Sequence, residues 1–82
     1  MPVINRMTPA GIRALGELAN GPMSGTELLI RVGFHWKQTL RVLESRGLVQ
    51  GQRRGYRLTP EGRAAVKDLL ETGDLTTAPE VN

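Results

Sequence analysis

The sequence predicts a small, mainly α-helical domain that carries one short β-hairpin. Three observations support this prediction. Serine or threonine caps precede segments whose apolar residues recur at helical spacing. Between residues 48 and 58 the pattern changes to short alternating segments around a charged turn, which is typical of a hairpin. The chain has 82 residues, fewer than the roughly 100–200 usual for a domain, so a second fold is not expected.

The first predicted helix begins at Thr8-Pro9, where a threonine cap is followed by a proline at the first helical position. Its apolar residues recur at helical spacing and are Ile12, Leu15, Leu18 and Ala19. Asn20-Gly21-Pro22 ends it, because proline cannot continue a helix. Residues 1–7 precede the cap, show no periodic pattern of apolar residues and are predicted to form an N-terminal arm.

The second predicted helix, Gly25–Arg31, begins with the capping box Ser24-Gly25-Thr26-Glu27. Its residues available for the core are Leu28, Leu29 and Val32. Gly33 breaks the helix.

The third predicted helix begins at Phe34 or His35 and ends at Arg46, before Gly47. Its apolar residues are spaced i, i+4 and i+7 and are Trp36, Leu40 and Leu43. At 100° per residue, the opposite side carries Gln38, Arg41 and Ser45, with Lys37 on one flank. Trp36 is therefore predicted to lie in the core.

A hairpin follows, with extended segments at 48–52 and 56–58 around the charged turn 53–55. Tyr56 is predicted to lie on its buried side. Thr59-Pro60 then repeats the helix start, and the last helix runs to Glu71 before Thr72-Gly73 ends it. Its apolar residues are Val66, Leu69 and Leu70. The domain is thus assigned to residues 8–73, and residues 74–82, which are polar, acidic and without period, are predicted to be a disordered tail.

The order of these elements is helix, helix, helix, hairpin, helix. The second and third helices are separated by about three residues around a glycine, which is the spacing of a helix-turn-helix. A two-stranded hairpin directly after the recognition helix is the wing of a winged helix. The predicted fold class is therefore a winged helix-turn-helix, with a recognition helix at about 34–46 and a wing at about 48–58.

The run LRVLESRGLVQGQRRGYRLTPEGRAAV, residues 40–66, resembles the end of the recognition helix, the wing and the next helix of MarR-type and PadR-type bacterial transcription regulators. GTELL, at 25–29, resembles the helix that precedes the recognition helix in PadR-type proteins. The likeness covers roughly residues 8–70 and rests on Leu40, Leu43, Glu44, Gly47, Leu48, Val49, Tyr56, Leu58, Thr59, Pro60, Glu61, Gly62 and Arg63. The resemblance implies a DNA-binding transcription regulator.

The charge of the chain is unevenly distributed. Residues 31–67 hold nine basic residues and two acidic ones, whereas the rest holds two basic and six acidic, for a net charge of +3. A concentrated basic stretch suggests an anionic partner, most often nucleic acid. The alternative interpretation is a solvated face with arginines at helix ends.

The candidate contacts to double-stranded DNA lie on the recognition helix and the wing. They are His35, Lys37, Gln38, Arg41, Arg53, Arg54 and Arg57. Glutamine can pair with adenine and arginine with guanine in the major groove, while arginines at a wing tip suit phosphates or a narrow minor groove.

Each candidate also has a structural interpretation. The helix residues could form an ordinary solvated face, and the tip arginines could keep the hairpin edge soluble. His35 suits a capping or packing role, or donation to a phosphate. Glu44 is expected to pair with Arg41 or with a wing arginine.

Several function classes are disfavoured. Without cysteine and with a single histidine, no disulfide, thiolate metal site, cofactor site or catalytic centre is expected, so the protein is not predicted to be an enzyme. No small-molecule ligand is evident. The longest apolar runs have three residues, so no membrane span is expected, and a cytoplasmic location is the default.

The leading hypothesis is a sequence-specific DNA-binding regulator, either a repressor or a phage- or plasmid-type control protein. The alternatives are a winged-helix protein-docking module without DNA-binding activity and an accessory to a nucleic-acid enzyme. A homodimer on DNA is also predicted. Its interface would use Val66, Leu69 or Leu70, together with Ile4 or Ile12, unless these residues belong to the core of the monomer.

Overall fold

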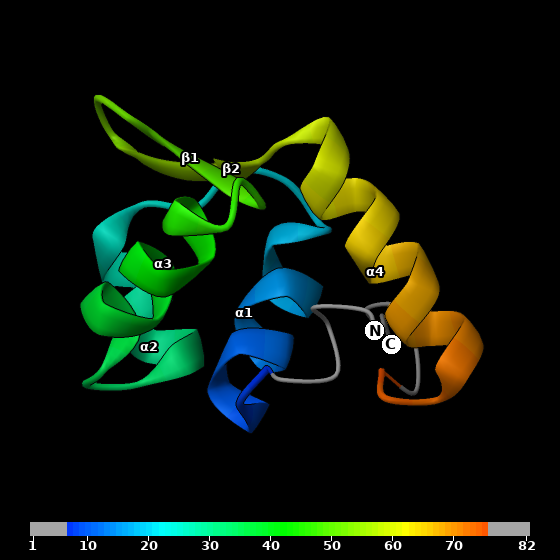
Figure 1. Cartoon of the computed structure of the whole chain (residues 1–82). Coiled ribbons are helices and arrows are strands. Elements are labelled where there is room, and N and C mark those ends of the chain that lie inside the picture. Colours follow the sequence, from blue (N-terminus) through cyan, green and yellow to red (C-terminus); the bar gives the residue numbers. More distant parts are fainter. Residues whose placement is uncertain (1–6, 76–82) are drawn as a thin grey trace.

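The computed structural model describes residues 7–75, which form four helices and one two-stranded antiparallel hairpin (Figure 1). The elements in chain order are α1 (Pro9–Leu18), α2 (Gly25–Val32), α3 (Trp36–Ser45), β1 (Val49–Gln52), β2 (Gly55–Leu58) and α4 (Pro60–Thr72). The predicted order of helices and hairpin is confirmed. Within the described residues, none of these helices has the length and apolar character needed to cross a membrane.

Three helices begin at the predicted caps. The backbone N–H of Gly11 donates to Thr8 Oγ1 over 3.1 Å, and that of Gly62 donates to Thr59 Oγ1 over 3.0 Å. At α2 both halves of the capping box are present, because Ser24 Oγ accepts from the Glu27 N–H and Glu27 Oε1 accepts from the Ser24 N–H. Each cap satisfies backbone donors that would otherwise lack a partner in the first helical turn.

The start of α3 differs from the prediction. The Trp36 N–H donates to the Gly33 carbonyl over 3.0 Å, which closes a turn over Phe34 and His35. Phe34 therefore belongs to this turn, and His35 occupies the N-cap position without a side-chain capping bond. His35 thus stands at the capping position that was one of its predicted roles, with its backbone in the turn (φ −91°, ψ 19°), but its side chain does not cap the helix.

At its other end α3 finishes at the predicted glycine. Gly47 adopts a φ of 78°, which lets its N–H donate to the Glu44 carbonyl and the Leu48 N–H donate to the Leu43 carbonyl. This Schellman arrangement turns the chain sharply into the hairpin. Thr59 then closes the connection, since its hydroxyl donates to the Gly47 carbonyl over 2.6 Å.

The hairpin pairs Val49 with Leu58 and Gly51 with Tyr56. A further bridge, absent from the sequence prediction, joins Met23 to Tyr56 through two backbone hydrogen bonds of 3.0 and 2.9 Å. The segment between α1 and α2 is therefore attached to the hairpin as a third extended chain.

The core surrounds α1, which packs against the other three helices and β2. Its buried apolar residues are Ala14, Leu15, Leu18, Met23, Leu28, Leu40, Leu43, Val49, Leu58, Ala65, Val66 and Leu69. One prediction of a core residue needs correction, because Leu29 is 41% exposed. Two other residues of the predicted apolar spacing, Ala19 and Leu70, are also exposed. In the run Leu28-Leu29-Ile30 successive side chains point about 100° apart, so a helix covered on one side buries only one of them.

The residues predicted for a dimer interface on α4 differ in burial. Val66 and Leu69 are buried within the protomer, where they pack in the same core as α1, whereas Leu70 is 36% exposed. Ile12 is half-buried against that core, and Ile4 lies outside the described residues. Val66 and Leu69 therefore stabilise the monomer, which was the other interpretation open from the sequence, and the homodimer itself stays a prediction.

The packed structure extends by at least one residue beyond each border of the predicted domain, residues 8–73. Met7, assigned to the arm, is half-buried against the core. Leu75, assigned to the disordered tail, also packs against the core, and its N–H donates to the Leu69 carbonyl over 3.0 Å. The remainder of the arm, residues 1–6, and of the tail, residues 76–82, lies outside the described residues.

The packing of Leu75 leads to a test by truncation. A chain that ends at Gly73 is expected to lose about 1–2 kcal/mol of unfolding free energy relative to one that ends at Leu75, because a half-buried leucine is removed. Urea unfolding followed by the fluorescence of the single tryptophan, Trp36, measures the difference. Equal stability of the two chains would contradict the contribution assigned to Leu75.

Candidate nucleic-acid interface

The outward side of α3 carries the polar residues that the sequence places there. Leu40 and Leu43 are buried, while Lys37, Gln38 and Arg41 are exposed. The two sets lie on opposite sides because residues on one helix face recur every three or four positions. Three candidate residues are thus brought together on one exposed helical surface.

Trp36 anchors the beginning of this helix. Its ring meets Tyr56 of β2 edge to face, with centroids 6.4 Å apart and an interplanar angle of 78°. On its other side it approaches α2 so closely that a Cβ at Gly25 would lie 3.0 Å from Trp36 Cη2. Lys37 Nζ stands 5.8 Å from the centroid of the same ring, a cation–π contact. The indole therefore holds α3 against both α2 and the hairpin, as a half-buried core residue.

Glu44 links the far half of α3 to the hairpin. Its Oε2 accepts a hydrogen bond of 3.3 Å from the backbone N–H of Gly51 in β1. The expected ion pair with Arg41 or a hairpin arginine is absent among residues 7–75. The reason is geometric, because Glu44 lies on the side of α3 that faces β1.

Replacing Glu44 with alanine is expected to loosen the hairpin locally. The Gly51 N–H would lose its carboxylate acceptor, which contributes about 0.5–1.5 kcal/mol in a typical protein hydrogen bond. Amide hydrogen exchange by NMR should show faster exchange at Gly51, with little change at Leu43 in the buried part of α3. Unchanged exchange at Gly51 would show that the hydrogen bond does not hold the hairpin.

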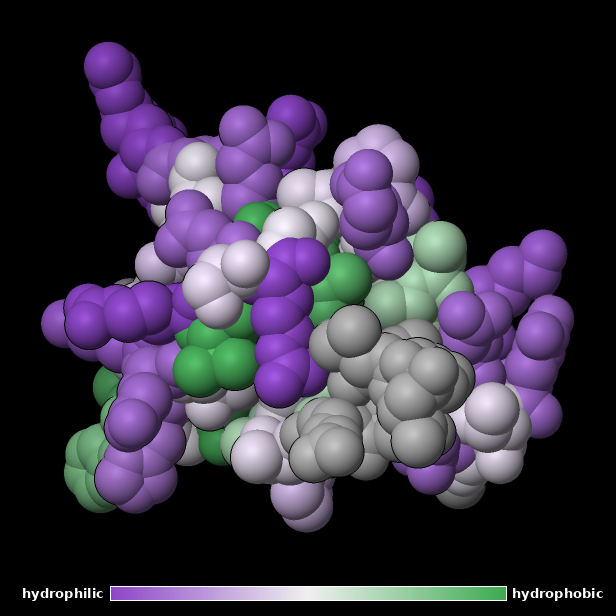
Figure 2. Space-filling model, in the orientation of Figure 1, coloured by the Kyte–Doolittle hydropathy of each residue, from purple (hydrophilic) through white to green (hydrophobic). Residues whose placement is uncertain are grey.

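Arg53 and Arg54 form the tip of the hairpin, and both are exposed. The tip projects at the upper left of Figure 1, and the strongly hydrophilic arm at the same place in Figure 2 belongs to this region. Neither arginine has a positive φ angle. The positive φ of this turn, 146°, belongs to Gly55. The local backbone thus leaves both guanidinium groups free to project.

Arg57 is not brought together with the residues of α3. Its Nη2 donates to Gln50 Oε1 over 3.2 Å, across the hairpin. Side chains alternate along a strand, so Arg57 points away from the face on which its neighbours Tyr56 and Leu58 meet the core. It borders a surface hollow beside Arg63 and the end of α1.

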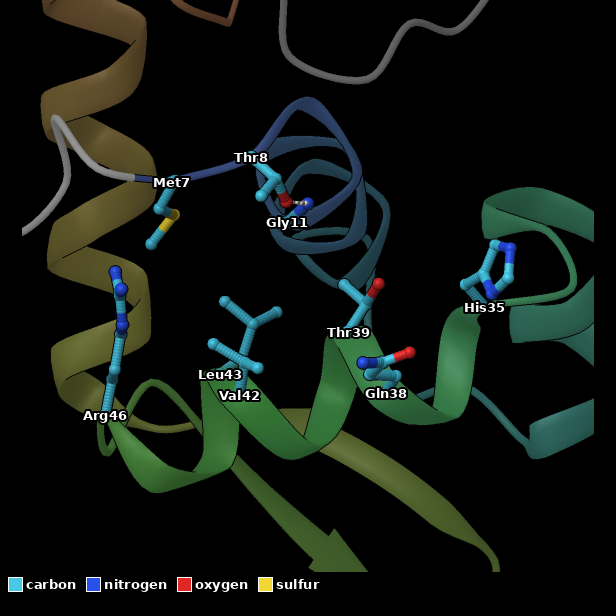
Figure 3. A pocket seen from close by; sticks show the side chains of 9 residues that line it. All are labelled: Met7, Thr8, Gly11, His35, Gln38, Thr39, Val42, Leu43 and Arg46. Atoms are coloured by element: carbon cyan, nitrogen blue, oxygen red, sulfur yellow. Dashed lines mark hydrogen bonds between the residues drawn. The ribbon is translucent and has the colours of Figure 1, made fainter.

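A second flank of α3 faces a cavity of about 220 Å³. Figure 3 shows its walls, built by one side of α3 and by the first residues of α1. The lining residues are Met7, Thr8, Gly11, His35, Gln38, Thr39, Val42, Leu43 and Arg46. His35 and Gln38 therefore lie at the border between this cavity and the outward side of α3.

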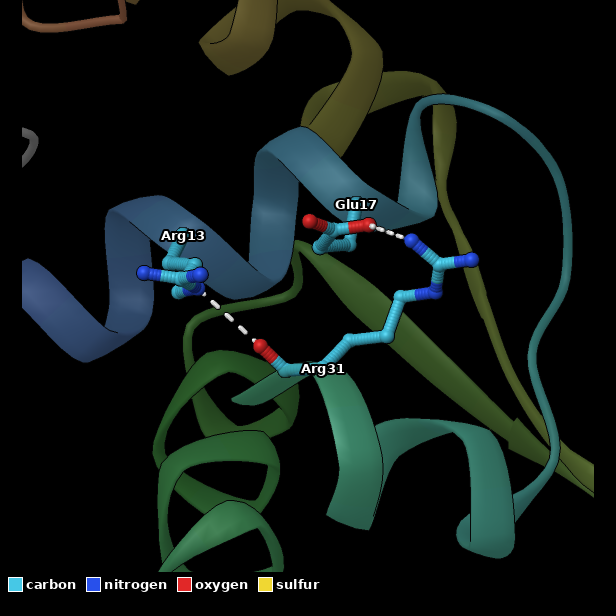
Figure 4. Close-up of polar contacts among 3 residues, drawn as sticks. All are labelled: Arg13, Glu17 and Arg31. Carbon is cyan, nitrogen blue, oxygen red and sulfur yellow. Dashed lines mark hydrogen bonds and ion pairs between the residues drawn. The ribbon is translucent and has the colours of Figure 1, made fainter. Parts of the chain in front are cut away.

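Two polar contacts join α2 to α1 (Figure 4). Arg13 Nε donates to the Arg31 carbonyl at the end of α2 over 3.0 Å. The Arg31 side chain in turn forms an ion pair with Glu17, with a distance of 3.6 Å between Nη1 and Oε1. Arg31, part of the basic stretch, is thus paired within the protein.

One exposed residue of this region is not among the predicted contacts. Phe34 was predicted only as a possible first residue of the helix, yet its side chain is 88% exposed. Its position outside the apolar spacing of α3, directly after Gly33, is the signal that could have singled it out.

The exposed side of α3 and the hairpin tip together form the candidate interface, which we call the basic face and define as Lys37, Gln38, Arg41, Arg53 and Arg54. In Figure 2 the hairpin tip is strongly hydrophilic, and the left side below it carries further hydrophilic surface interrupted by apolar patches. Within the described part of the chain, no three histidine, aspartate or glutamate side chains gather as a metal site would require. No protein-family model, no curated protein and no solved structure matches this chain.

Proposed function

We propose that this protein binds double-stranded DNA sequence-specifically and acts as a transcription regulator, in the form of a repressor. The observation that carries the proposal is the basic face, in which an anchored helix and the hairpin packed beside it expose four cations and an amide. In this proposal the fold is a winged helix-turn-helix, α3 is its recognition helix and the hairpin is its wing.

The dimensions of the major groove admit an α-helix. With α3 in the groove, Arg41 would donate both guanidinium arms to a guanine, and Gln38 would pair with an adenine. Lys37, whose ammonium group lies beside the Trp36 ring, is placed for a guanine or for a phosphate.

The wing tip supports a different kind of contact. Arg53 and Arg54 project beyond the helix, so the backbone and the minor groove next to the α3 site are within their reach. Positive charge in either place contributes affinity with a strong salt dependence. The resemblance of residues 40–66 to MarR-type and PadR-type regulators agrees with this division between helix and wing.

We further propose that two copies bind one site. One small module contacts few base pairs, and two-fold pairing doubles the number that are read. Because Val66 and Leu69 are occupied in the core, Leu70 is the residue of the three on α4 that is exposed for such pairing.

The proposal is tested by selecting binding sites from a random duplex library. We expect enrichment of one motif in two inverted copies, with half-sites about one helical turn apart. The control is the triple variant Lys37→Ala/Gln38→Ala/Arg41→Ala, which removes exposed side chains and should remain folded by circular dichroism while losing the enrichment. No enrichment with the unchanged protein would reject the proposal.

The second candidate is a protein-docking module, and a specific observation favours it. Ile30 is 75% exposed on α2, next to the partly exposed Leu29, and such apolar surface is typical of docking sites. A module of this kind does not need the basic face. An unchanged protein that enriches no duplex would therefore favour this second function.

A further inference from the structure

An aromatic side chain stands exposed at the entrance to α3. Phe34 is 88% exposed, more than any other large apolar residue among those described. Green, apolar surface appears at the lower left of Figure 2, where Figure 1 shows α2 and its connection to α3. An exposed phenylalanine offers apolar surface whose burial against a partner lowers the free energy.

The backbone holds this side chain at the corner of a hydrogen-bonded turn. Gly33, with a φ of 116°, ends α2, and its carbonyl accepts the Trp36 N–H, so Phe34 occupies the corner of a hydrogen-bonded turn. Trp36 is packed against both Gly25 and Tyr56 on the far side of that turn. The two ends of the turn are therefore held by packed elements, and the ring at its corner points to solvent.

The position of the turn relates Phe34 to the basic face. It immediately precedes His35, the N-cap of α3, and lies three and four residues before Lys37 and Gln38. In a helix-turn-helix, the N-terminal residues of the recognition helix meet the base edges. If α3 enters the major groove as proposed above, the Phe34 ring enters with it.

We propose that Phe34 is a base-reading residue that recognises thymine through its C5-methyl group. The inference rests on the proposed function and names one element of its specificity. A phenyl ring offers no hydrogen bond to a base edge, and thymine carries the apolar methyl group of the major-groove code. Contact with that methyl group removes apolar surface from water on both partners.

The methyl group can be deleted without other change, because deoxyuridine keeps every hydrogen-bonding group of thymidine. In the duplex recovered by selection, each thymidine of one half-site is replaced singly by deoxyuridine. For the unchanged protein, we expect one position to lower the affinity by about threefold to tenfold, the size of one buried methyl group.

The same series is then measured with protein variants. Phe34→Ala should bind the thymidine duplex more weakly and respond to deoxyuridine at that position by less than about 1.5-fold, whereas Phe34→Leu should keep much of the response. Ile30→Ala is the matched control, since it also removes an exposed apolar side chain, on α2, and should keep the full response.

The outcomes separate this inference from the function on which it rests. Failure to prefer the selected duplex over a scrambled one rejects DNA recognition, and with it the role of Phe34. The role of Phe34 alone is overturned if the protein prefers the selected duplex but Phe34→Ala keeps the response to deoxyuridine. It is equally overturned if the protein prefers the selected duplex but responds to deoxyuridine at no position. Loss of the response in Phe34→Ala but not in Ile30→Ala is the result that we expect.

Discussion

Replacing Gly55 with alanine is expected to lower the free energy of unfolding by about 3 kcal/mol, a large part of the stability of so small a domain. Gly55 has a φ of 146°, a backbone conformation that residues with a side chain rarely adopt. A Cβ there would also collide with the carbonyl oxygen of Met23, at the bridge that ties the α1–α2 segment to the hairpin. The backbone would have to open this bridge to accept the methyl group.

Gly21→Ala is the matched control. Gly21 has a similar φ of 136°, but nothing lies within 4 Å of a Cβ built on it. The Gly21→Ala variant should therefore lose only the unfolding free energy that the unfavourable φ angle costs, about 1–2 kcal/mol. Urea unfolding of both variants, followed by Trp36 fluorescence, measures the difference. Equal losses at the two positions would show that the contact with Met23 carries no extra cost.

Replacing Arg41 and Arg53 separately with alanine is expected to give two different defects in DNA binding. Arg41→Ala should cost about 1–3 kcal/mol on the selected site and relax the preference at one base pair, because a base contact in the major groove is lost. Arg53→Ala should weaken binding to all duplexes alike and reduce the slope of log affinity against log salt by about one per protomer, because a phosphate contact is lost.

The two variants are compared on a selected and a scrambled duplex over a series of salt concentrations. Arg63→Ala on α4 serves as control, because it also removes one exposed arginine but outside the basic face. The structure strengthens the prediction for Arg41, since Glu44 is engaged by the Gly51 N–H and does not hold Arg41 within the helix. If neither Arg41→Ala nor Arg53→Ala changes any affinity, the basic face is not a DNA interface.

The candidate site was only partly accessible from the sequence. The helical spacing of Trp36, Leu40 and Leu43 placed Gln38 and Arg41 outward, and the charged turn placed Arg53 at a hairpin tip. Arg57 was predicted as a contact because it is a cation of the predicted wing. Its exclusion from the basic face required the strand register, which pairs it with Gln50 on the other side of the hairpin.

The sequence by itself determined the helices and the hairpin of this protein and the residues at which the helices begin and end. The caps at Thr8, Ser24 and Thr59 each act on a backbone N–H three residues away, so their geometry is complete within one helical turn. Gly47 and Gly73 end helices through their own positive φ angles. Such signals can be read locally because no other part of the chain takes part in them.

Only the tertiary structure decided which faces are covered. Leu28 is buried while Leu29 and Ile30 are exposed, although all three are equally apolar, because α1 and α3 cover one side of α2 only. The Met23 bridge and the Glu44 contact join segments whose separation in space is set by the whole core. The exposure of Phe34 has the same origin, since no described element packs over the turn that presents it. Burial is a property of the assembled elements, and a periodic pattern specifies a face without specifying what lies against it.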